Sequence, residues 1–569
     1  MSASADIVID EYDRIALSQY YDNLQPLTSS IGQRALTTTG LDIYSGDWGE
    51  AEVLHLLRRC LFGVKYSEFD IYKLKGLSEA IETIVTTDPD PAPPVNDYYE
   101  ELADPDVGAG QTWITAPKGE NSVNNKRINS LNVWLNANMI NQPATIHEKM
   151  ILFWHNLIPT ENWGVSVPKM SYQYFMTLRK YALGNYKSLI REITLDPAML
   201  KYLNGNSNQV GSPDENYARE LQELFTVGKG SGSGYTEKDI QEAARLLTGF
   251  RYNWNDLNAE GAVSSYFQAN KHDTGNKQFS SFYGNRLIKG GSNGYDELDE
   301  LVDMIFETDE VAKYFCRRLY NFFVYSDIDE SVETNVIEPL AQLMRDSNYE
   351  VMPVVKKLLS SAHFFDDANR GAQIKNPMDH LFGFWRTTDT QHIDESNGYL
   401  KHKTFMAVYN NYQKATGMPI GNPPSVAGWP AYYQTPTLDR MWISTDSITI
   451  RAAYVERMIN GKWWIAKIDS TAQYLATDVI RFAETLSVPS NPNELIRDCW
   501  KLLMGMALTQ ESLDYLKSAL LSGQDKDSYW SGAWSDYKVA PTEMNRQVVE
   551  SRLRAMLVAM CQLGEFQLM

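Results

Sequence analysis

The chain consists mostly of segments with helical periodicity, joined by polar connections. From Trp48 onward, apolar residues recur every three to four positions, the spacing of one face of an α-helix. Examples are WGEAEVLHLLRRCLFG, EKMILFWHNLI, EKDIQEAARLLTG and NVIEPLAQLMRDSNYEVMPVVKKLLSSAHFF. The pattern predicts a mainly α fold, a multi-helix array with long loops.

Two regions interrupt this pattern. Residues 88–120 are rich in Pro, Asp and Gly, and residues 251–294 in Gly, Ser, Asn and aromatics. Loops of this length in a compact chain are often functional. Within the second region, FRYNW and SYFQANKH favour a small β-hairpin. We expect an N-terminal arm over residues 1–47, a helical region over 48–569, and a subdivision of that region near 386–400.

Composition narrows the function classes. The 569 residues are 43% hydrophobic and carry a formal charge of −20. Because a phosphate polymer requires basic surface, this charge argues against a nucleic-acid partner. The sequence contains no run of 18 apolar residues, so we expect no direct membrane span. Its N-terminus also has no apolar signal segment, and the sequence by itself therefore points to the cytoplasm. The four cysteines are widely spaced, which predicts buried thiols.

The first candidate for chemistry is SPDENYARELQELFTVGKG, residues 212–230. Ser212 suits an N-cap, Pro213 the first helical position, and Glu215 can close a capping box. At about 100° per residue, one face of this helix collects four polar side chains. They are Asn216, Arg219, Glu220 and Glu223. This face is either a solvated helix surface or the lining of a polar functional site, and the spacing of the residues is compatible with both.

A second candidate is HDTGNK, residues 272–277. His272 could act as a general base with Asp273 orienting it, and Lys277 could bind an anionic substrate or pair with Glu220. The alternative is a turn held by side-chain-to-backbone bonds.

Two arginines, Arg219 and Arg245, lie on successive predicted helices. They suit either substrate binding or a buried Arg/Glu lattice that fixes helix packing. The intervening KGSGSGY lacks the spacing of a phosphate-binding P-loop, and the sequence has no GxSxG, HExxH or GxGxxG motif. We expect Arg219 to be buried and paired with two carboxylates.

Two aromatic positions complete the candidates. Trp429, in the rigid turn NPPSVAGWP, could stack on a sugar ring or peptide, or pack in the core. His155 could bind a metal ion with Glu220 or Glu223 as further ligands, although no Glu-x-x-His pair is present. The alternative for His155 is a hydrogen-bonded core histidine.

Six segments in order resemble the bacterial domain-of-unknown-function 1800 family. They are HLLRRCLFG (55–63), EKMILFWHN (148–156), DENYARELQELFTVG with YTEKDIQEAARLLTGF (214–250), HDTGNK (272–277), NPPSVAGWP (422–430) and GEFQ (564–567). The landmarks cover the chain from about residue 50 to its end. The family's activity is not established, so the resemblance does not indicate which reaction the chain catalyses or which cofactor it binds.

The resemblance does imply an envelope-associated or exported protein whose partner resembles the domain-of-unknown-function 1501 proteins. One position departs from the family, where an Asn-His pair often follows Phe-Trp. Here Leu157 stands in place of that His, so either His155 substitutes for it or the site is lost.

Two functions remain open. The chain is either a hydrolase or transferase acting on an envelope or exported substrate, or a non-catalytic scaffold or accessory subunit. For both we expect one composite site, in which His272 and Lys277 meet the carboxylates Glu220 and Glu223.

Overall fold

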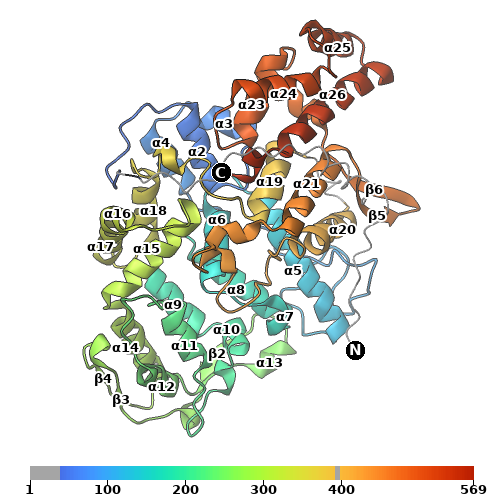
Figure 1. Cartoon of the computed structure of the whole chain (residues 1–569). Coiled ribbons are helices and arrows are strands. Elements are labelled where there is room, and N and C mark those ends of the chain that lie inside the picture. The colour runs from blue at the N-terminus through green and yellow to red at the C-terminus, as the bar shows by residue number, and fades with distance from the viewer. Residues whose placement is uncertain (1–36, 38, 391–396) are drawn as a thin grey trace. The chain divides into compact units, whose positions relative to one another are not determined.

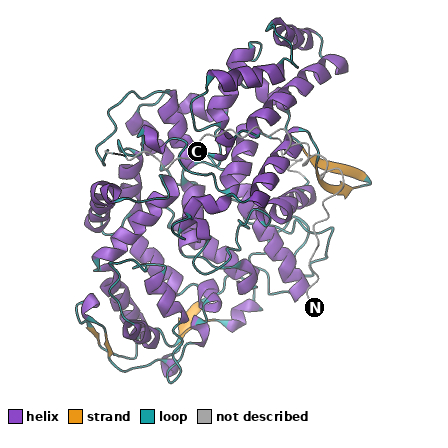
Figure 2. Cartoon of the chain, in the orientation of Figure 1, coloured by secondary structure: helices purple, strands orange, loops and turns teal. Residues whose placement is uncertain are grey.

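A computed structural model describes residues 37, 39–390 and 397–569, and helices dominate these residues (Figures 1 and 2). The mainly α prediction is confirmed. The helices of the first half are α2 (Glu50–Cys60), α3 (Tyr66–Tyr72), α4 (Leu77–Ile84), α5 (Asn121–Asn141), α6 (His147–Leu157), α7 (Asn162–Val165), α8 (Pro168–Lys180), α9 (Tyr186–Thr194), α10 (Pro197–Tyr202), α11 (Asn216–Glu223), α12 (Glu237–Leu246), α13 (Trp254–Leu257) and α14 (Gly294–Phe306).

The second half continues in the same way. Its helices are α15 (Asp309–Phe323), α16 (Glu330–Val332), α17 (Glu338–Asp346), α18 (Val351–Leu359), α19 (Pro377–Thr387), α20 (Gly398–Val408), α21 (Thr445–Ile459), α22 (Val479–Glu484), α23 (Pro492–Leu503), α24 (Gln510–Leu520), α25 (Ser528–Val539) and α26 (Glu543–Cys561), followed by the short η9 (Gly564–Gln567). No helix in the described part of the chain has both the length and the apolar character needed to cross a membrane.

Among the described residues, strands form three separate antiparallel pairs. The pair β1 (Phe250–Tyr252) with β2 (Ser265–Phe267) is the hairpin that the sequence predicts. The pairs β3 (Lys277–Gln278) with β4 (Leu287–Ile288), and β5 (Trp463–Ile468) with β6 (Thr471–Leu475), are additional. The β5–β6 turn uses Asp469 and Ser470, both at positive φ, which matches a tight hairpin turn.

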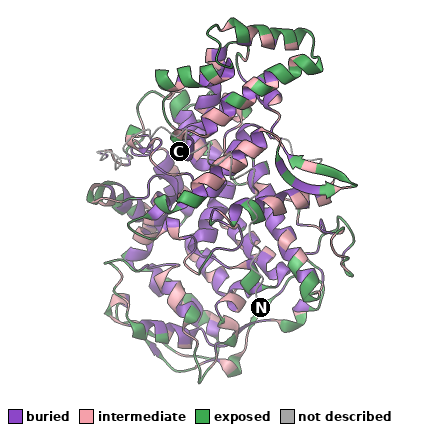
Figure 3. Ribbon diagram, turned by 45° about the vertical axis from the view of Figure 1, so that its right-hand side comes forward, coloured by how far each residue is buried: buried purple, intermediate pink, exposed green. Residues whose placement is uncertain are grey.

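The core of residues 37–569 is one connected apolar cluster, and these residues form one compact unit. Every residue of α6 is buried (Figure 3). The four cysteines are free and buried, as predicted. Most of the predicted arm, residues 1–47, lies outside the described residues, as do residues 391–396 of the segment where we expect a subdivision.

The fold brings distant landmarks of the sequence into contact. The loop 422–430 packs on the end of α6, where the Trp429 N–H donates to Asn156 Oδ1 at 2.9 Å. The segment 272–277 packs on α12, and η9 packs near α2 and α19. Landmarks that are hundreds of residues apart therefore meet in space.

Candidate functional site

The helix α11 begins at Asn216, three residues beyond the predicted first position, Pro213. Asp214 Oδ1 accepts a hydrogen bond from the Asn216 N–H at 2.9 Å, while Ser212 lies in a preceding turn. The predicted capping box of Ser212 and Glu215 was therefore wrong, because Asp214, closer to the helix, accepts the hydrogen bond of its first N–H group. The Asn216 side chain is exposed.

The polar face of α11 is an ion-pair network at the surface. Arg219 donates to Glu215 at 2.9 Å, pairs with Glu237, and lies 3.6 Å from Glu223. Lys229 pairs with Glu223 at 2.5 Å. The multiple pairing of Arg219 is confirmed, but its predicted burial was wrong, since its side chain is 32% exposed. The helix buries its apolar stripe and leaves this face at the solvent boundary.

His272 and Lys277 do come together, but around Glu297 on α14. His272 Nε2 lies 2.9 Å from Glu297 Oε1, and its Nδ1 lies 2.9 Å from the carbonyl oxygen of Thr248. Lys277 Nζ donates to Glu297 Oε2 at 2.6 Å, and the Gly291 N–H donates to Oε1 at 2.8 Å. The three side chains are buried. The expected pairing of His272 and Lys277 with Glu220 and Glu223 was therefore wrong.

Glu297, the buried carboxylate that binds both His272 and Lys277, is the residue of this site that the sequence analysis missed. Burial acts to raise its pKa, but hydrogen bonds from His272 and Lys277 outweigh burial and hold the pKa below its usual value. The segment GYDELDELVD offers several acidic residues in a row, and nothing in their spacing distinguishes the one that turns inward. Its place in the first turn of α14 also favours a negative charge.

Asp273 has a different partner from the one expected. Its carboxylate accepts two hydrogen bonds from Arg245, at 2.9 and 3.1 Å, and Arg245 also pairs with Glu242 at 2.6 Å. Burial acts to raise the pKa of Asp273, and the bonds from Arg245 bring it below its usual value. The dyad in which Asp273 orients His272 is not formed. Asp273 Oδ1 also accepts a hydrogen bond from the Gly275 N–H at 2.8 Å, the side-chain-to-backbone turn that the sequence left open as the alternative. The bonds from Arg245 fix this turn to α12.

Glu220 stands apart from both networks. Within the described ranges no hydrogen bond or ion pair reaches its half-buried carboxylate. Burial raises its pKa, and the neighbouring charge of Glu223 raises it further. Burial raises the pKa of the nearby Tyr202 phenol to about 12, and the charges of Glu161 and then Glu220 are the smaller causes. Glu220 is thus the one predicted acid–base residue that carries a perturbed pKa and no fixed partner among the residues described.

His155 and Trp429 belong to the core. The His155 ring lies 5.5 Å from the Trp429 ring, and its Nδ1 lies 3.0 Å from the Tyr174 hydroxyl. Burial lowers the pKa of His155 to about 3, so the ring is neutral. The described residues contain no group of three His, Cys, Asp or Glu side chains able to hold a metal ion, and the geometry does not support a metal at His155.

Comparison with known proteins gives a family and no named activity. No curated protein and no solved structure matches the chain. Residues 55–568 match the family described as "Protein of unknown function (DUF1800)", which is nearly the whole chain and contains every candidate site residue described above. The landmark segments and their contacts therefore fall inside the matched region, and the chain belongs to the DUF1800 family.

Proposed function

We propose that the chain is a non-catalytic accessory subunit of an exported or envelope-associated complex, and that the β5–β6 hairpin docks the partner. The observation that carries this proposal is an exposed aromatic pair. Trp464 and Tyr474 face each other across the two strands and are 55% and 48% exposed. Aromatic side chains of this kind are enriched among the residues that contribute most to protein interfaces.

The opposite face of the hairpin anchors it to the molecule. Trp463 and Leu475 are buried, and the Trp463 ring lies 4.5 Å from the ring of Tyr454 on α21. The hairpin contacts α20 and α21, and its outer face is exposed in Figure 3. A firmly held support with an apolar outer face loses little conformational entropy when a partner binds.

The state of the predicted catalytic groups also supports a non-catalytic role. His272, Asp273 and Lys277 each bind an internal carboxylate, arginine or backbone group, so none is free to exchange a proton with a substrate. The family resemblance suggests the kind of partner, a protein similar to the domain-of-unknown-function 1501 proteins.

The test is binding of the purified chain to a purified protein of that kind from the same organism. We expect the double variant Trp464→Ser/Tyr474→Ser to bind roughly tenfold more weakly or worse, as for the loss of interface aromatics. Trp254→Ser is the matched control, because Trp254 is 60% exposed and lies on α13. Equal binding by all three proteins, or no binding by the unchanged chain, would refute the proposal.

A second candidate, a hydrolase or transferase, rests on Glu220 alone. Its raised pKa and lack of a fixed partner among the described residues suit a general acid. Chromogenic esters, glycosides and phosphomonoesters would reveal turnover, and Glu220→Gln should abolish it while Glu223→Gln retains most of it. Turnover that survives Glu220→Gln would remove this candidate.

A further inference from the structure

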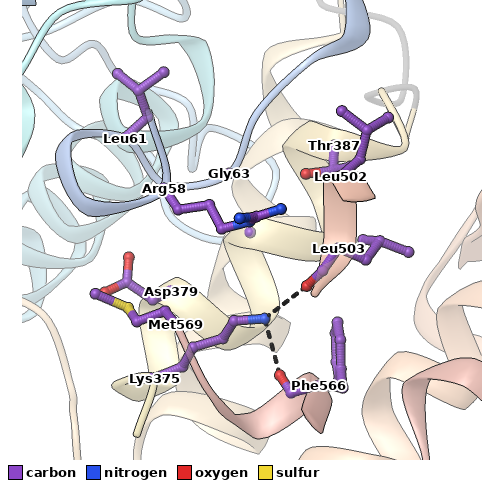
Figure 4. Close-up of a pocket in the computed structure, with 11 residues that line it drawn as sticks. Arg58, Leu61, Gly63, Lys375, Asp379, Thr387, Leu502, Leu503, Phe566 and Met569 are labelled. Carbon is purple, nitrogen blue, oxygen red and sulfur yellow. Dashed lines mark hydrogen bonds between the residues drawn. The ribbon is translucent and has the colours of Figure 1, made fainter. Parts of the chain in front are cut away.

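A small cavity lies where the first and last landmarks of the sequence meet. It is lined by Arg58 near the end of α2, by Lys375 just before α19, by Asp379 in the first turn of α19, and by Phe566 in η9 (Figure 4). Its volume is about 20 Å³. Because a cavity of roughly 10–15 Å³ by this measure holds one water, the space suits one or two waters or one small polyatomic ion.

Lys375 enters this cavity without a carboxylate partner. Its ammonium donates to the carbonyl oxygens of Leu503 at 3.0 Å and Phe566 at 2.9 Å, and lies 4.4 Å from the centre of the Phe566 ring. An ammonium has three donors, so one bond remains. No ion pair to Lys375 is found within residues 39–390 and 397–569. Two carbonyls and a ring do not neutralise a buried charge.

Arg58 approaches the same space from the other side, as Figure 4 shows. Its guanidinium donates to the carbonyl oxygen of Lys501, and its Nε is buried without any hydrogen-bond partner. No carboxylate of the described chain pairs with it. Burial, with the charge of Arg58 as the next largest cause, lowers the pKa of Lys375 to about 7. The two cations are thus close enough to repel each other.

The carboxylate that lines the cavity is already used. Asp379 pairs with the buried Lys149 and accepts a hydrogen bond from Asn376 at 2.6 Å. Behind Lys375, Arg451 donates to its carbonyl oxygen at 3.0 Å, and Arg451 Nη1 is buried without a partner. Positive charge therefore exceeds negative charge around the cavity, in a chain whose formal net charge is −20.

We propose that Arg58 and Lys375 bind a small inorganic oxyanion, of the size of phosphate or sulfate, in this cavity. An oxyanion accepts several charge-assisted hydrogen bonds at once, which would satisfy the third donor of Lys375 and the guanidinium of Arg58. It would also connect α2, α19 and η9. The anion is either free in solution or the phosphoryl group of a larger molecule, since Arg58 is only half-buried.

The test uses the full chain in a buffer free of small oxyanions, with sodium gluconate holding the ionic strength constant. We expect phosphate and sulfate to raise the melting temperature with a saturable dependence, and chloride and acetate to do so only weakly. Phosphoserine distinguishes the two sources. Binding tighter than that of phosphate indicates a phosphorylated ligand, whereas weaker binding indicates the free ion.

Two variants make the assignment specific. Arg58→Gln and Lys375→Met should each bind phosphate about tenfold to a hundredfold more weakly, the effect of losing one charged hydrogen bond. Without phosphate, Lys375→Met should melt no lower than the unchanged chain, because it removes a repelled charge. Arg497→Gln and Lys467→Met are matched controls at exposed positions. If Lys375→Met does not fold, equilibrium dialysis of phosphate against Arg58→Gln gives the same answer.

The proposal is overturned if the melting temperature follows only ionic strength, or if all anions act alike on the unchanged chain and on Arg58→Gln. Either result would mean that Arg58 and Lys375 do not bind an oxyanion in this cavity.

Discussion

The substitution Lys277→Met tests whether the network around Glu297 holds the fold together. Methionine nearly matches the length of lysine, so the change removes the charge with little change in packing. Lys277 is 0% exposed and its Nζ lies 2.6 Å from Glu297 Oε2. Breaking a buried pair costs about 3–5 kcal/mol of stability. Because His272 and the Gly291 N–H still serve the carboxylate, we expect the lower end, about 3 kcal/mol.

The matched control is Lys229→Met. Lys229 lies 2.5 Å from Glu223, but its side chain is 65% exposed, and exposed pairs contribute about 0–1 kcal/mol. Urea unfolding followed by circular dichroism measures both variants, and calorimetry should show a fall of roughly 3 °C for Lys277→Met in a chain of this size. Equal losses from the two substitutions would show that burial does not decide the strength of these pairs, and would refute the reasoning.

Three further predictions follow from the same contacts. Arg219→Ala should cost about 1 kcal/mol or less, because its pairs lie at the surface, and a loss near 3 kcal/mol in urea would contradict this. Glu297 has a pKa below its usual value, so its contribution to stability is present above about pH 4.5 and falls away as acid protonates it; Glu297→Gln should flatten this acid limb of the melting temperature. The pKa of Lys375 is lowered to about 7 in the folded chain, where Arg58, Arg451, Cys561 and Asp379 surround it. The contribution of Lys375 to the free energy of unfolding should therefore rise between about pH 7 and 10.5, and Lys375→Met should remove that rise.

The fold class could be predicted because it depends on periodicity, which is local. The apolar spacing of α6 and α12 and the strand-forming residues of β1 and β2 are all visible in the sequence. The β5–β6 hairpin was missed because it is short and lies directly between two helices. Its turn residues, Asp469 and Ser470, are not among the strongest turn pairs.

The partners within the site could not be predicted, because they depend on tertiary contacts. Sequence analysis found that His272 and Lys277 need a carboxylate, but the candidate it chose, Glu220, lies on another helix from the one they contact. The partner is Glu297, on the helix that follows, and it resembles its acidic neighbours in every local respect. Likewise, Arg219 has the predicted pairs but not the predicted burial, because helical spacing gives a face and not its depth.

The three places where landmarks meet differ in how completely their polar groups are satisfied. At the first, Asn156 accepts a hydrogen bond from the backbone of Trp429. At the second, Arg245 donates hydrogen bonds to both carboxylate oxygens of Asp273. These two junctions have a structural role, since each bond joins two parts of the chain.

At the third junction, around Lys375, buried positive charge has no ion pair among the described residues. A structural role alone would favour neutral or paired groups at such a place, because an unpaired buried charge destabilises the fold. The unpaired Lys375 is therefore the observation that sets this junction apart from the other two and supports the oxyanion site proposed there.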